Sequence, residues 1–141
     1  MDVLRVVNES RQSVLGGRIR IADTMRARLR GFLFRGKPAS GEGLLLAPCK
    51  GVHMYGMRFP LDVLFIDEAG CVIATHANLA PGQRTPMYPT ARYALELPVG
   101  AIASTETDVG DRLSWKPTGM HEENGHEARR APLATARGAD R

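Results

Sequence analysis

The segment Leu61-Asp-Val-Leu-Phe-Ile-Asp-Glu-Ala-Gly-Cys-Val-Ile-Ala-Thr-His76 decides the fold class of this protein. Residues 61–67 and 71–76 are rich in β-branched and aromatic side chains, which favour extended strands. The three residues between them, Glu68-Ala-Gly70, form a short turn that includes a glycine, so the two runs are predicted to pair as a β-hairpin. The sequence therefore predicts a sheet at the middle of the chain.

Further short strands are predicted on both sides of this hairpin. They span 3–7, 17–22, 43–47, 92–97 and 111–115, with a short helix or loop at 99–105. Along 92–97, Tyr93, Leu95 and Leu97 alternate with Arg92, Ala94 and Glu96, as the two faces of a strand require. About seven short strands predict a mainly β (α+β) fold, a small β-barrel or a sandwich-like sheet.

One amphipathic helix is predicted over 24–35, packed against the sheet. Asp23 or Thr24 caps its first turn, and its apolar residues recur on a single face. The same segment carries a group of arginines, namely Arg26, Arg28, Arg30 and Arg35. These form a solvated face or, as the alternative, a contact for phosphate or RNA.

Length and composition describe one domain. The chain has 141 residues, of which 43% are hydrophobic, and we place a single globular domain at 1–116. Residues 117–141 have almost no large apolar side chain, so a disordered tail is predicted there. Two cysteines are too few for a disulfide framework, and no apolar run nears the roughly 18 residues of a membrane helix. Met1-Asp-Val-Leu-Arg5 lacks a secretory signal, so a cytoplasmic location is expected.

The segment 41–67 contains the best candidates for a functional site. Four polar side chains, those of Cys49, His53, Arg58 and Asp62, are interleaved there with Met54, Tyr55, Met57 and Phe59. Apolar walls with a few convergent polar groups are typical of a ligand pocket. The same mixture also fits a core loop.

Several kinds of chemistry are compatible with these residues. Cys49 as a thiolate, His53 as its base and Asp62 as the orienting group would make a nucleophilic enzyme. Cys49 and His53, with Cys71 and His76, are the candidates for a metal site, although their spacing is not specific. Arg58 and Asp62 either form a structural ion pair or anchor an anion or a sugar hydroxyl. No metal and no cofactor are expected.

Several stretches taken together resemble a known family. They are residues 28–35, 41–49, 53–67, 91–100 and 110–113, of which Met57-Arg-Phe-Pro-Leu-Asp62 is the most specific. In this order they are similar to the uncharacterised bacterial and archaeal family called domain of unknown function 192. The resemblance implies a compact, mainly β fold with an accessory helix, no established reaction, and a periplasmic location as the alternative to the cytoplasm. By match to the family motifs, it implies a ligand-binding site at Cys49, His53, Met57, Arg58 and Asp62.

The hypothesis from the sequence is a small ligand-binding or accessory domain with a pocket at 49–62. Its partner is expected to be a small polar or anionic ligand, because the net charge of +4 is modest beside that of nucleic-acid binders. No specific nucleic acid and no membrane span are expected. The alternative is a Cys/His-dependent hydrolase or a metal-assisted enzyme, so the sequence leaves open whether the protein is an enzyme.

Overall fold

The computed structural model describes residues 3–22 and 36–118. The helix predicted over 24–35 lies outside the described residues, as does the tail predicted over 117–141 except for its first two residues. Among the described residues, no helix has the length and apolarity needed to cross a membrane. Pro117 belongs to the last strand, one residue beyond the expected end of the domain.

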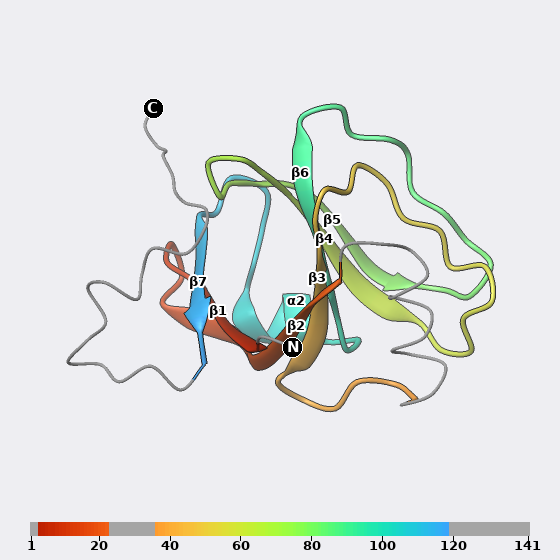
Figure 1. The fold of residues 1–141 in the computed structure, drawn as a ribbon, viewed down its shortest axis with the longest axis horizontal. Coiled ribbons are helices and arrows are strands. Elements are labelled where there is room, and N and C mark those ends of the chain that lie inside the picture. Colours follow the sequence, from red (N-terminus) through yellow and green to blue (C-terminus); the bar gives the residue numbers. More distant parts are fainter. Residues whose placement is uncertain (1–2, 23–35, 119–141) are drawn as a thin grey trace.

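Within these residues the chain forms seven strands and one short helix (Figure 1). The strands are β1 (Val3–Asn8), β2 (Ser13–Ala22), β3 (Glu42–Leu46), β4 (Leu61–Asp67), β5 (Val72–Leu79), β6 (Ala91–Leu97) and β7 (Leu113–Pro117). The helix, α2 (Ala101–Thr105), follows β6. The predicted mainly β fold is confirmed.

All seven strands belong to one sheet with the order β5-β4-β6-β3-β2-β1-β7. Only the β2–β3 pair is parallel among the described strand pairs. The sheet is open, so the predicted alternative of a closed barrel is not supported. The starts of its edge strands β5 and β7 approach each other through an isolated antiparallel bridge between Cys71 and Arg112. Backbone hydrogen bonds of 2.8 Å flank this bridge, from the Leu113 N–H to Gly70 O and from the Val72 N–H to Asp111 O.

The predicted hairpin is confirmed, because β4 and β5 pair antiparallel with Leu64 opposite Thr75. Gly70 closes its turn with φ 91°, a left-handed conformation that favours glycine. β4 is also hydrogen-bonded to β6 on its other side. This central position explains why residues 61–66 are all buried, since both faces of β4 are covered.

A hydrophobic cluster covers each face of the sheet. The cluster beside α2, here the helix-side cluster, contains Leu64, Ile66, Leu95, Leu97 and Trp115 among others. The opposite one, here the loop-side cluster, contains Leu61, Val63, Phe65, Ala94, Val52, Met54 and Met57 among others. The alternation predicted for 92–97 is confirmed, and both of its faces are buried from Ala94 onward, including the carboxyl group of Glu96.

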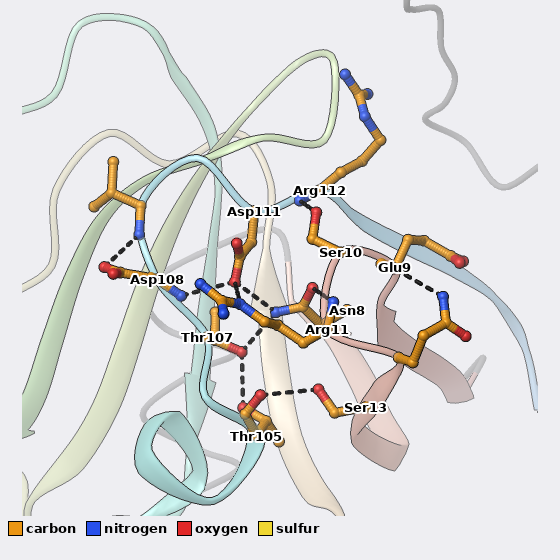
Figure 2. A network of polar contacts seen from close by, with 12 residues as sticks. Asn8, Glu9, Ser10, Arg11, Ser13, Thr105, Thr107, Asp108, Asp111 and Arg112 are labelled. Carbon is orange, nitrogen blue, oxygen red and sulfur yellow. Dashed lines mark hydrogen bonds and ion pairs between the residues drawn. The ribbon is translucent and has the colours of Figure 1, made fainter.

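A buried polar network joins the β1–β2 turn to the segment before β7 (Figure 2). Asp111 accepts hydrogen bonds from the Asn8 side chain at 3.0 Å, Arg11 Nε at 3.1 Å and the Asp108 N–H at 2.9 Å. Asn8 also donates to the hydroxyl of Thr107 at 2.9 Å. Because these contacts span about 100 residues of sequence, they fix the end of β1 to the segment that leads into its neighbour β7.

This network makes stability depend on pH through Asp111. The hydrogen bond from Asn8, followed by those from Asp108 and Arg11, holds the pKa of the Asp111 carboxyl below its ordinary value of 3.8. The folded protein therefore binds this proton less tightly than the unfolded chain does. The stabilisation is complete above pH 3.8 and is lost as the pH falls through the lower value of the folded state.

We expect Asp111→Asn to lower the free energy of unfolding by about 2 kcal/mol at pH 7, because bonds to a charged acceptor are weakened. Urea unfolding at pH 7 and near pH 3 measures this effect. The difference from the wild type is expected to shrink at the acidic pH. The exposed neighbour Asp108 provides the control, since Asp108→Asn should change little, and an equal loss at both pH values would contradict the assignment.

Candidate functional site

Two segments, residues 47–60 and 80–92, run side by side over the loop-side cluster (Figure 1), and the second ends in the first two residues of β6. We call them together the loop ribbon. Backbone hydrogen bonds join them along their length: Cys49 to Arg92, Tyr88 to Lys50, Thr85 to Val52, Met54 to Gln83 and Gly82 to Met54, at 2.7–3.0 Å. The hydroxyl of Thr85 adds a bond from the Val52 N–H at 3.0 Å. The segment that sequence reasoning selected is therefore held in place by a partner segment some 30 residues downstream.

Apolar side chains fix the loop ribbon to the sheet. Val52, Met54 and Met57 are 3%, 0% and 6% exposed and belong to the same cluster as Phe65. Met57, a predicted site residue, is thus a core anchor of the loop ribbon. Cys49 is half-buried and packs against the same cluster.

The turn Met54-Tyr-Gly-Met57 displays an aromatic ring on the surface. The Met57 N–H donates to Met54 O at 3.2 Å, and Gly56 supplies the positive φ of 83° that closes the turn. The two methionines point into the core while Tyr55 between them is 51% exposed. Because both ends of the turn are buried, the ring is presented from a fixed base.

His53 and Tyr55 form a stacked pair, with ring centroids 4.9 Å apart and planes inclined by 24°. The Tyr55 N–H also donates to His53 Nδ1 at 3.3 Å, which orients the imidazole. His53 pairs with Arg84 through an isolated antiparallel bridge. Directly opposed residues in such a bridge carry their side chains on the same side, so the Arg84 side chain leaves the loop ribbon on the side of His53.

The loop ribbon carries an unbalanced charge. Its two segments contain Lys50, Arg58, Arg84 and Arg92 and no aspartate or glutamate. All four cations are exposed residues. Lys50 bonds the carbonyl oxygens of Pro89 and Ala91 at 2.8 and 3.3 Å, beside a hollow of about 520 Å³. Arg92 lines the same hollow, together with the acids Asp67 and Glu68 of the β4–β5 turn.

Asp62 lies on the other face of the sheet. It is 1% exposed, and its carboxylate accepts the backbone N–H groups of Asn78 at 2.9 Å, Gly100 at 3.1 Å and Ile102 at 2.9 Å. It therefore joins the end of β5 to the start of α2. Arg58 is exposed and forms no ion pair with Asp62, so the predicted structural pair is absent and the structure does not bring these two residues together.

Cys49 and His53, the residues proposed for thiol chemistry, are both hydrogen-bonded to backbone groups within their own segment. Cys49 Sγ donates to Gly51 O at 3.2 Å, and His53 Nδ1 is occupied by the Tyr55 N–H. Cys71 lies at the β4–β5 turn, and the two cysteines do not form a disulfide with each other. Within residues 3–22 and 36–118, no three metal-ligating side chains of His, Cys, Asp or Glu come together.

Comparison with known proteins identifies the family. The profile of domain of unknown function 192, described as Uncharacterized ACR, matches residues 6–115, which include the whole loop ribbon. The chain belongs to this family. The resemblance inferred from the sequence motifs is therefore confirmed.

Among the relatives of this chain are uncharacterised proteins of two archaea. A UPF0127 protein of Thermococcus kodakarensis is 29% identical over 122 residues, covering 83% of this chain and 76% of its own. A UPF0127 protein of Pyrococcus horikoshii is 30% identical over 115 residues, covering 78% of this chain and 97% of its own.

Two crystal structures share the fold. One is a protein of unknown function from Novosphingobium aromaticivorans, with a TM-score of 0.66, 24% identity, and coverage of 80% of this chain and 84% of that one. The other is described as a putative transcription regulator from Sinorhizobium meliloti, with a TM-score of 0.64, 26% identity, and coverage of 84% and 95%.

In this member of the domain of unknown function 192, sequence reasoning missed some residues. Arg84 lies in an irregular stretch, and nothing in its local pattern indicates that it faces His53. The sequence around Tyr88 likewise does not indicate its contact, in which the Tyr88 hydroxyl lies 2.8 Å from Nε2 of His76. Burial lowers the pKa of this His76 imidazole. Glu96 is fully buried, and a lone acid in the apolar run 93–97 was a signal that could have marked it.

Proposed function

We propose that this protein is a small binding domain that takes an anionic ligand of low molecular mass on the outer surface of its loop ribbon. The observation that carries the proposal is the charge of this surface. Four exposed cations lie on two segments that contain no acidic residue. Such a cluster attracts anions and holds phosphate or carboxylate oxygens through charge-assisted hydrogen bonds.

The rigidity of the loop ribbon supports the same proposal. Its cations project from backbone that is hydrogen-bonded across the two segments and anchored through Met54 and Met57. A site held on a fixed backbone loses little conformational entropy when a ligand binds. Of the residues predicted from the sequence, His53 and Arg58 contribute side chains to this surface. Cys49 and Met57 support it from below, and Asp62 serves the opposite face of the sheet.

Titration with inorganic pyrophosphate, followed by backbone amide NMR, tests the proposal. We expect the amide shifts to change within 49–58 and 82–92, and the affinity to fall as sodium chloride is raised, since screening weakens exposed charge pairs. The double variant Arg58→Glu/Arg84→Glu should reduce affinity at least about tenfold, because two attractive contacts become repulsive.

Arg5→Glu is the matched control, because Arg5 lies on β1 at the opposite end of the sheet. This variant changes the net charge in the same sense and should leave pyrophosphate binding close to that of the wild type. Shifts confined to β1 and β7, or no shifts at all, would contradict the proposal.

A further inference from the structure

Tyr55 is the feature of the loop ribbon that anion binding alone does not explain. An inorganic anion needs only the cations, yet the turn at Met54–Met57 places an aromatic ring at its tip with half of the side chain exposed. The ring is oriented by its stacking on His53 and by the backbone bond to that imidazole. An oriented, exposed ring is a surface on which a flat ligand can stack.

The neighbours of the ring extend this surface. Met87 is 68% exposed and lies against Gly51, two residues before His53 in the same segment. Arg84 lies on the same side of the loop ribbon as His53. A thioether and an aromatic pair thus provide apolar contact on the side of the loop ribbon that carries Arg84, whose guanidinium can bind two oxygen atoms at once.

We infer that the anion bound by the loop ribbon is a mononucleotide, with its base stacked on Tyr55 and its phosphate held by Arg84 and Arg58. This inference rests on the proposed function and names the ligand class of the same site. A nucleotide joins a flat π-system to a phosphate, which matches the pairing of an exposed ring with exposed arginines. Neither a sugar nor an inorganic anion uses both halves of this surface.

Isothermal titration calorimetry with adenosine 5′-monophosphate, inorganic phosphate and adenosine as three separate probes tests the inference. The nucleotide is expected to bind at least about tenfold more tightly than either fragment, because phosphate lacks the base that stacks on the ring and adenosine lacks the charge that binds the arginines. Tyr55→Ala should bring nucleotide affinity down to about that of phosphate. Tyr55→Phe, which keeps the stacking ring, should retain wild-type affinity.

Arg84→Gln separates the two halves of the site. This variant should weaken binding of the nucleotide about tenfold while leaving adenosine unchanged, since only the phosphate needs the guanidinium. Circular dichroism melts of each variant establish that it folds. Both substituted side chains are exposed, so the melts should match that of the wild type.

The results distinguish this inference from the proposed function. If phosphate and pyrophosphate bind at the loop ribbon but the adenine base adds no affinity, the nucleotide assignment is overturned and the anion site stands. If no anion binds there, both are wrong. An oligonucleotide of six deoxyadenosines serves as a further probe, and affinity for it about tenfold above that of the mononucleotide would overturn the assignment in favour of single-stranded nucleic acid.

Discussion

Asp62→Ala is expected to lower the free energy of unfolding by about 4 kcal/mol, because one buried carboxylate satisfies three backbone donors. The N–H groups of Asn78, Gly100 and Ile102 all donate to it. Without the carboxylate, which is itself 1% exposed, these three donors lose a charged acceptor that water replaces only in part. The end of β5 and the start of α2 then lose their common attachment to β4.

Urea unfolding at pH 7 measures the effect, and Asp62→Asn provides the graded comparison. The asparagine keeps one acceptor oxygen in nearly the same place, so its loss of stability should be smaller. Asp67→Ala is the matched control at the other end of β4. The Asp67 carboxylate accepts only the N–H groups of Ala69 and Cys71 within its own turn, and its removal should cost about 1 kcal/mol.

The Asp62 experiment also bears on the location of the site. If Asp62→Ala left stability unchanged but abolished pyrophosphate binding, the carboxylate would be a ligand-binding group and the structural role assigned to it would be wrong. The arrangement of its three donors favours the opposite result, a large loss of stability.

Gly43→Ala is expected to lower the free energy of unfolding by about 3 kcal/mol, because strand β3 has no room for a side chain at this position. An added Cβ would overlap the backbone carbonyl oxygen of Glu96 on β6 and would lie 3.0 Å from Leu97 Cδ2. The obstructing oxygen belongs to a central strand that cannot shift without disturbing its hydrogen bonds to β4. Thermal and urea unfolding both measure the loss.

Gly17→Ala in β2 is the control for this substitution. An added Cβ there meets nothing within 4 Å, and the Gly17 backbone has no positive φ. This variant should change stability by no more than about 0.5 kcal/mol. Equal effects of the two substitutions would show that loss of glycine itself, rather than the close approach of β3 to β6, determines the cost.

The site was only partly predictable from the sequence. The composition of 49–62 indicated one segment of the loop ribbon, because polar and aromatic residues lie close together there. The second segment was not predicted, since Arg84 reaches His53 only through a bridge between residues 31 positions apart. The sequence also placed Asp62 with His53 and Arg58, although strand alternation turns its carboxylate toward α2 on the opposite face.

By itself, the sequence determined the strands, the β4–β5 hairpin and the family, because these depend on alternation, turn residues and motif order within short windows. Only the tertiary structure decided that the sheet stays open, which face each polar side chain occupies, and which distant segment completes the loop ribbon. The physical reason is that strand pairing and hydrogen bonds between remote segments depend on how the whole chain closes on itself. Local propensity does not encode the partner of an irregular segment.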